Sequence, residues 1–237
     1  MRQHPISPVT EPMQYRAIGV VRGHYVPADP DQPTRGVIRT ADGSELDAVV
    51  LGRLLTLMRR HLDLNLPHLW VVYPRCREPE QLHLQMVGVW EPSTLTPGPA
   101  DDTPEVPPPA DELPEGDDYF SVRGELLFTR PETGDLVVKV RQQPRPDGSR
   151  PIPFKLQLKG TIPLEHLRHF VALDLRRQGQ NLVLENLEVI GPLPQRGRRN
   201  DRPRRGGPQR REGERSGDPR PAARPRSHGR AITRPGR

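Results

Sequence analysis

The chain has 237 residues, of which 32% are hydrophobic, and a net charge of +6. With 31 prolines and 21 glycines, this composition is typical of small folded blocks separated by unfolded stretches, not of one large core. No apolar run approaches the ~20 residues that span a bilayer, and no apolar stretch follows Arg2, so neither a membrane span nor a secretory signal is expected. Cys76 is the only cysteine, which excludes an intramolecular disulfide and fits a reducing compartment. We expect a cytoplasmic protein.

The chain begins with a proline-studded arm, residues 1–12, that we expect to be disordered. A foldable block, residues 13–90, follows it. Its apolar runs and turn residues predict five strands with a helix at 51–62 between the third and fourth strands. The predicted strands are 15–25, 36–40, 45–50, 69–73 and 82–90.

Residues 91–118 contain eight prolines and nine acids but no basic residue. This composition predicts a disordered acidic linker. Two roles remain open for it. It is either a solubilising spacer or a loose competitor that pairs with the basic end of the chain when no nucleic acid is bound.

A second foldable block, residues 119–191, has the clearer strand pattern. Apolar and polar residues alternate in LVVKVR and in FKLQLK, which places the valines and leucines inward and the lysines outward. Residues 163–169 allow one or two helical turns. The predicted strands are 119–128, 136–141, 154–159, 170–175 and 181–190.

Residues 192–237 form a basic tail that we expect to be disordered. Its last 43 residues hold 15 arginines, no lysine and four acids, a net charge of +11 that leaves the rest of the chain at −5. So few apolar side chains cannot offset the entropy of ordering the chain. Arginine suits phosphate recognition because its planar fork of donors is always charged, so RNA is the expected partner. The tail residues predicted to bind are Arg196, Arg198, Arg199, Arg202, Arg204, Arg205, Arg210 and Arg211.

Both blocks follow the order strand–strand–strand–helix–strand–strand within about 70 to 80 residues. This order resembles the OB-fold, a five-stranded Greek-key barrel. We therefore predict a mainly β protein with two OB-like barrels, an acidic proline-rich linker and a basic tail. Two unrelated β-rich domains, or one larger sandwich interrupted by the linker, are the alternatives. The stretches HLWVVYPR and LHLQMVGVWEP also resemble an uncharacterised family of conserved cyanobacterial proteins, which implies no particular activity.

The OB-fold resemblance implies a ligand face on the second and third strands of a barrel and on the adjoining loops. In the second block this face would attract phosphate oxygens, unless it is an ordinary solvated sheet face. The predicted binding residues there are Lys139, Arg141, Lys155, Lys159, Arg145 and Arg150, and the first block adds Tyr73 and Arg75. Aromatic residues make up only 4% of the chain, and those in small barrels are mostly core. Bases would then find few stacking partners, which predicts low sequence specificity.

No motif indicates catalysis, a metal or a cofactor. His166 and His169, which follow Glu165, are only two histidines with the single cysteine elsewhere, and they fall short of the three or four converging ligands of a zinc site. Cys76 lies between two arginines that would lower its pKa, but a lone cysteine in a loop is usually inert. We therefore expect a non-enzymatic accessory protein that binds RNA or single-stranded nucleic acid. The alternatives are a module that docks on a ribonucleoprotein or other complex, and a ligand-binding subunit of an enzyme. The sequence does not predict an oligomeric state.

Overall fold

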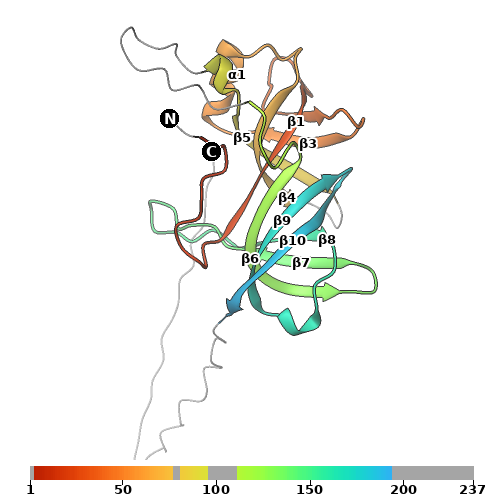
Figure 1. The fold of residues 1–237 in the computed structure, drawn as a ribbon. Coiled ribbons are helices and arrows are strands. Elements are labelled where there is room, and N and C mark those ends of the chain that lie inside the picture. Colours follow the sequence, from red (N-terminus) through yellow and green to blue (C-terminus); the bar gives the residue numbers. More distant parts are fainter. Residues whose placement is uncertain (1–2, 77–80, 96–110, 194–237) are drawn as a thin grey trace, which may run out of the picture. The chain divides into compact units, whose positions relative to one another are not determined.

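A computed structural model of the chain describes residues 3–76, 81–95 and 111–193 (Figure 1). The predicted tail from residue 194 and the middle of the predicted linker, 96–110, lie outside these residues. Within them, ten strands form one continuous sheet that closes into two barrels. None of the helices in this part of the chain has the length and apolarity that a membrane crossing requires.

The first barrel follows the OB strand order. Around it, β1 pairs with β2, β2 with β3, β3 with β5 in parallel, β5 with β4, and β4 with β1. A helix, α1, lies in the chain between β3 and β4, as predicted. The elements are β1 (Arg16–Pro27), β2 (Arg35–Arg39), β3 (Glu45–Val50), α1 (Arg53–His61), β4 (His68–Cys76) and β5 (Leu82–Val89), followed by the short α2 (Pro92–Leu95).

The second barrel repeats this order, including the parallel pair β8–β10 and the closing pair β6–β9. Its elements are β6 (Tyr119–Arg130), β7 (Asp135–Val140), β8 (Phe154–Lys159), η1 (Leu164–His166), β9 (His169–Gln178) and β10 (Asn181–Pro192). The predicted architecture of two OB barrels is confirmed. The helix predicted at 163–169 is one 3-10 turn, and Arg168 after it has a φ of 62°.

The two barrels are joined by strand pairing as well as by the chain between them. The first residues of β1 pair antiparallel with those of β6, from Arg16 opposite Arg123 to Gly19 opposite Phe120. We call this pairing the seam, and Figure 1 shows β1 and β6 side by side there. The inward side chains of both barrels form one hydrophobic cluster. The barrels therefore pack as a single body with a shared core.

Two segments that the sequence predicted to be disordered pack on the folded part, and one of them covers the outer side of β1 and β4. Ile18 and Val20 point to this side, so the sheet is apolar there and must be covered. Leu113 of the predicted linker packs on them and is 8% exposed, and Ile6 of the predicted arm is 6% exposed. His4 and Glu115 join the two segments, with Nε2 3.0 Å from the carboxylate. The described parts of both segments thus make defined contacts.

A buried arginine of the second barrel connects it to the first. Arg177 on β9 donates from Nε and Nη2 to the carboxylate of Asp118, at 2.7 and 2.9 Å. Its Nη1 reaches Asp42 in the β2–β3 turn at 3.1 Å. The sequence had placed Arg177 in a turn, but β9 is longer than predicted and brings this residue to the first barrel.

Candidate nucleic-acid interface

The outward side chains of β7 and β8 carry the predicted basic face. Leu136, Val138 and Val140 point into the barrel, so the alternation turns Lys139 outward, and the same alternation turns Lys155 and Lys159 outward on β8. Lys139 and Lys155 lie directly opposite each other in the strand pair. The inward and outward alternation predicted for these strands is therefore the observed one.

Two of the three lysines on this face are paired with carboxylates. Lys139 Nζ donates to Glu125 Oε2 at 3.0 Å, and Lys159 Nζ donates to Asp135 Oδ1 at 2.8 Å. The hydrogen bond from Lys159 lowers the pKa of the Asp135 carboxyl. Lys155 is exposed. The face is consequently less positive than the lysines alone imply, and Lys155 is the one of its three lysines that is exposed.

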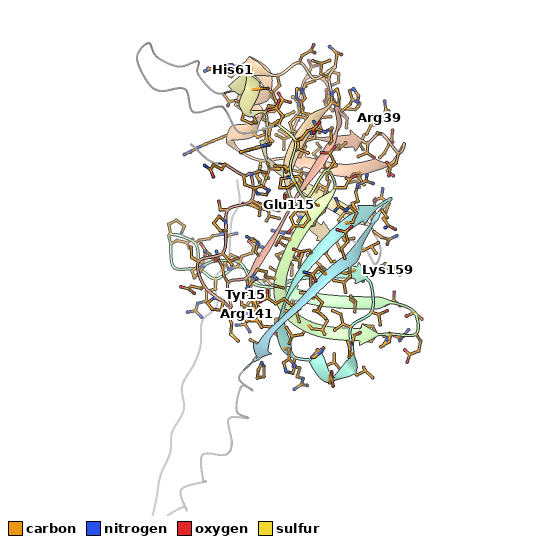
Figure 2. The ribbon with its side chains drawn as sticks, viewed as in Figure 1. Tyr15, Arg39, His61, Glu115, Arg141 and Lys159 are labelled. Carbon is orange, nitrogen blue, oxygen red and sulfur yellow. The ribbon has the colours of Figure 1, made fainter. Side chains whose placement is uncertain are left out.

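The loop between β7 and β8 extends the positive charge of this face. Arg145 and Arg150 are exposed on it, and a turn closed by Arg145 N–H to the Ser149 carbonyl (2.9 Å) shapes it. At the base of the loop, the Arg141 guanidinium lies 5.4 Å from the centre of the Tyr15 ring (Figure 2). Ile152 is 86% exposed, a large apolar side chain beside these cations.

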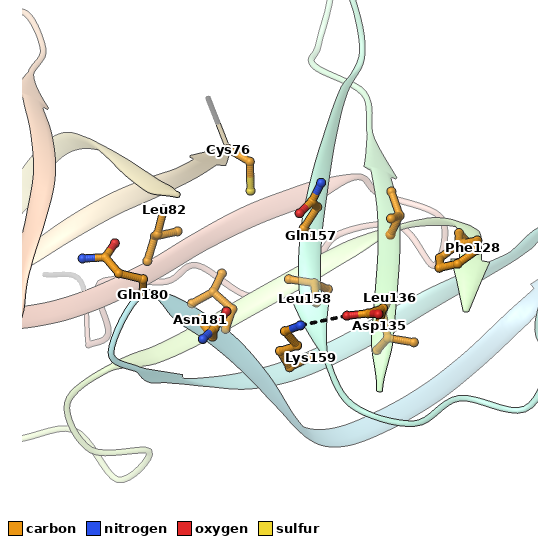
Figure 3. A pocket seen from close by; sticks show the side chains of 12 residues that line it. Cys76, Leu82, Phe128, Asp135, Leu136, Gln157, Leu158, Lys159, Gln180 and Asn181 are labelled. Carbon is orange, nitrogen blue, oxygen red and sulfur yellow. Dashed lines mark hydrogen bonds and ion pairs between the residues drawn. The ribbon is translucent and has the colours of Figure 1, made fainter. Parts of the chain in front are cut away.

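A pocket of about 240 Å³ opens beside this face (Figure 3). It lies where β7 and β8 meet the β9–β10 turn, the region that the OB-fold resemblance assigns to ligands. The ion pair of Lys159 with Asp135 borders it. The polar lining residues are Asp135, Gln157, Lys159, Gln180 and Asn181, and the apolar ones are Cys76, Leu82, Phe128, Leu136, Val137, Leu158 and Leu182.

The first barrel contributes one wall of this pocket. Cys76 and Leu82 come from the facing ends of β4 and β5. Beside them, the Arg75 guanidinium stacks over the ring of Phe154, 3.8 Å from its centre. Burial raises the pKa of the Cys76 thiol above its ordinary value. The pocket is thus a composite of both barrels and contains no activated thiol.

The first barrel has a corresponding groove of about 300 Å³ on its own second and third strands. The two sites correspond in the strand order of their barrels. Arg35 opposite Val49 on β2 and β3 corresponds to Asp135 opposite Lys159 on β7 and β8. The lining residues of this groove are Val26, Pro27, Ala28, Arg35, Gly36, Val37, Asp47, Ala48, Val49 and His83.

Family comparisons agree with this arrangement. The N-terminal OB-fold domain of the PatR RNA-binding protein matches residues 17–97. A cyanobacterial C-terminal OB-fold-like RNA-binding domain matches residues 122–191. The chain belongs to this cyanobacterial family of tandem OB-fold RNA-binding proteins. A comparison with curated proteins finds no match.

Most aromatic side chains of the two OB domains are core residues. Trp70 is fully buried and donates its indole N–H to the Gly23 carbonyl at 2.9 Å, while Trp90 is 9% exposed. Tyr73 and Phe128 are 37% and 39% exposed. The described surface of the OB domains therefore presents few rings on which bases could stack.

The other predicted binding residues fall in different places. Arg75 lies in the contact between the OB domains, where burial lowers its pKa, and its Nη1 donates to the Pro74 carbonyl at 2.9 Å. Tyr73 is half-exposed on β4. The eight tail arginines lie outside the described residues.

The histidines of the C-terminal OB domain do not assemble a metal site. The His166 and His169 rings contact each other edge to face, 5.8 Å apart, and His166 Nε2 is 3.5 Å from the Glu165 carboxylate. Across residues 3–76, 81–95 and 111–193, no three His, Cys, Asp or Glu side chains group as metal ligands would.

Sequence reasoning missed the amide side chains of the pocket. Gln180 was interpreted only as part of a turn, Asn181 only as the start of the last strand, and Gln157 only as an outward strand residue. The predicted barrel order itself would have indicated them, because the turn between the fourth and fifth strands of an OB barrel lies beside the second and third strands.

Proposed function

We propose that the chain is a non-enzymatic RNA-binding protein of low sequence specificity that follows the sugar–phosphate backbone. Its main supporting observation is the exposed cationic group formed by Arg145, Arg150 and Lys155, on the β7–β8 loop and β8 of the C-terminal OB domain. Charged donors of this kind contact phosphate oxygens in any sequence, and their contribution weakens as salt rises.

Low specificity follows from what this surface presents to the bases. Stacking on aromatic rings contributes ~1–3 kcal/mol per base in single-strand binders, but Trp70 and Trp90 are core residues here. Phosphate contacts position a nucleic acid and carry no sequence information. We therefore propose that the protein contacts RNA directly, in preference to a ribonucleoprotein partner. We also propose that it acts in the cytoplasm.

A pair of charge-matched variants tests the proposal. The triple variant R145Q/R150Q/K155Q removes three charges from the cationic group, and R53Q/R59Q/R60Q removes three exposed charges from α1. Fluorescence anisotropy with an unstructured RNA oligonucleotide should show about tenfold weaker binding for the first variant and a much smaller change for the second. Equal weakening would show that binding reports only total charge and would refute the proposed face.

Specificity is measured with the same assay. Oligonucleotides of equal length but different sequence should bind within about fivefold of one another, because stacking and phosphate contacts tolerate every base. A preference of a hundredfold or more for one sequence would contradict low specificity and would point to the amide side chains of the pocket as base readers.

A further inference from the structure

Two arginines face each other across the seam with no acid between them. Arg16 on β1 is directly opposite Arg123 on β6, and residues opposed in this way project from the same side of the sheet. Like charges in such a position destabilise a strand pair. Neither side chain is within ion-pair distance of a carboxylate in the described part of the chain. The repulsion between the two positive charges must therefore be offset by groups other than carboxylates.

The N-terminal segment supplies most of that compensation through backbone carbonyls. Arg16 Nη1 donates to the Ser7 carbonyl at 2.7 Å, and Arg123 Nη2 donates to the Pro12 carbonyl at 2.6 Å. A third bond runs from Arg16 Nη2 to the Ser121 hydroxyl at 2.7 Å. Neutral acceptors of this kind satisfy guanidinium hydrogens without cancelling the charge.

The two guanidinium groups keep unused donors. Arg123 is only 7% exposed, yet its Nε and that of Arg16 are buried without a hydrogen-bond partner. Burial and the neighbouring Arg123 lower the pKa of Arg16. The carboxylate whose charge acts on Arg16 is that of Asp174, which already accepts from Tyr119 at 2.6 Å and Asn186 at 3.3 Å. A ligand with several negatively charged oxygens would bind this arginine pair more strongly than the two neutral carbonyls do.

The covering segment is held by few contacts. Ile6 is buried and His4 pairs with Glu115, while Val9 and Met13 are 36% and 41% exposed. At its end, the ring of Tyr15 packs edge-on against Phe170, with centroids 4.9 Å apart. A segment with so few buried side chains opens more easily than the barrels beneath it.

We propose that residues 3–15 are a strap over a phosphate-binding site formed by Arg16 and Arg123, and that an RNA phosphate displaces the strap. This inference rests on the proposed RNA binding. Phosphate oxygens replace the Ser7 and Pro12 carbonyls as acceptors, and charge-assisted bonds of this kind are roughly twice as strong as neutral ones. Arg141, beside Tyr15, links the site to the basic β7–β8 loop, so one RNA strand reaches both (Figure 2).

Hydrogen exchange of the intact protein, with and without an unstructured RNA oligonucleotide, tests the displacement. RNA should protect the β7–β8 loop while amide exchange in residues 3–15 becomes about tenfold faster or more, because the strap leaves its site. Protection of the loop with unchanged or slower exchange in residues 3–15 would overturn the strap and leave the proposed RNA binding intact. If RNA slows amide exchange in no part of the protein, both the strap and the proposed RNA binding are wrong.

Two matched variants test the site itself. I6S removes the buried anchor of the strap, whereas V9S makes a similar change at an exposed position of the same segment. I6S should bind the oligonucleotide about threefold to tenfold more tightly than V9S, because the arginines are uncovered. Adding R16Q should abolish this gain. Equal affinity of I6S and V9S, or a gain that survives R16Q, would refute the site.

Inorganic phosphate used alone separates a phosphate group from other features of RNA. It should raise the melting temperature of I6S more than that of V9S, and R16Q should remove the difference. If phosphate stabilises both variants equally, the arginine pair does not bind phosphate and the inference is wrong.

Discussion

Gly19 lies directly beneath the ring of Phe120 at the seam between the two barrels. The residues are opposite each other on β1 and β6, and a Cβ on Gly19 would lie 2.2 Å from Phe120 Cδ1. Phe120 is fully buried in the core that both barrels share. A side chain at position 19 and the ring at position 120 cannot occupy this space together. The close approach of the barrels therefore depends on a glycine here.

We predict that G19A destabilises the protein by about 2 kcal/mol, because overpacking a well-filled core typically costs 1–3 kcal/mol. G88A is the matched control, since a Cβ on Gly88 would lie 3.7 Å from Val71, an ordinary contact. Urea unfolding should show a lower midpoint for G19A and an unchanged or slightly higher one for G88A. Equal midpoints would mean that the seam adjusts without cost.

The hydrogen bonds that Asp42 accepts predict a pH dependence of stability. The Asp42 pKa lies well below its ordinary value, mainly because the Thr40 hydroxyl donates to it, with further help from the Ser44 N–H and from Arg177. A carboxyl whose pKa is lower in the folded state stabilises the protein above its unfolded pKa, about 4. This contribution is lost as the pH falls through the folded pKa.

D42N should accordingly reduce the loss of stability below about pH 4. The measurement is the melting temperature across this range, for D42N and for D31N, which changes an exposed aspartate of the β1–β2 loop. D31N should follow the wild type. If D42N keeps the full dependence of the wild type, other carboxyls account for the acid sensitivity.

The basic tail should supply a large part of the affinity for RNA. Deleting residues 195–237 removes a net charge of +11. If the intact protein engages about six to eight phosphates, its salt slope on a single strand is about −4 to −6, and the deletion should flatten it and weaken binding. Titrations at several salt concentrations measure both quantities. Unchanged affinity after the deletion would show that the OB domains bind alone.

The acids of the predicted linker should divide into two groups. Asp117 and Asp118 already pair with Arg22 and Arg177 in the folded part, so D117N/D118N should lower the melting temperature. The acids at positions 101, 102 and 105 lie outside the described residues, and we expect them to compete with RNA for the tail. The variant D101N/D102N/E105Q should bind RNA more tightly at about 50 mM salt, and the gain should fade at several hundred millimolar.

The linker prediction has a clear alternative result. If D101N/D102N/E105Q binds no better than the wild type at low salt, these acids are a spacer, and binding through the tail is unaffected. A melting temperature that is unchanged in D117N/D118N would mean that the ion pairs of these residues contribute little to the fold.

The sequence determined the elements of each barrel. Alternation in 136–141 and 154–159 predicted which side chains face inward, because successive residues on a strand point to opposite sides. The repeated element order then predicted both barrels, and the structure confirms them. These signals are local, since they depend on neighbouring residues and on turn residues between strands.

Tertiary structure alone decided how the barrels join and what covers them. Gly19 meets Phe120 from 101 positions away, and nothing near either residue in the sequence indicates this contact. The burial of Ile6 and the packing of Leu113 on β1 are equally non-local, so proline-rich segments that resemble free chain become part of the fold.

The same distinction applies to charge. The sequence predicted lysines on one face but not that Glu125 and Asp135 would neutralise two of them, nor that Arg16 and Arg123 would meet without an acid. Composition gives the number of charges in a segment. Their pairing depends on which strands lie side by side, and that is set by burial of apolar surface over the whole chain.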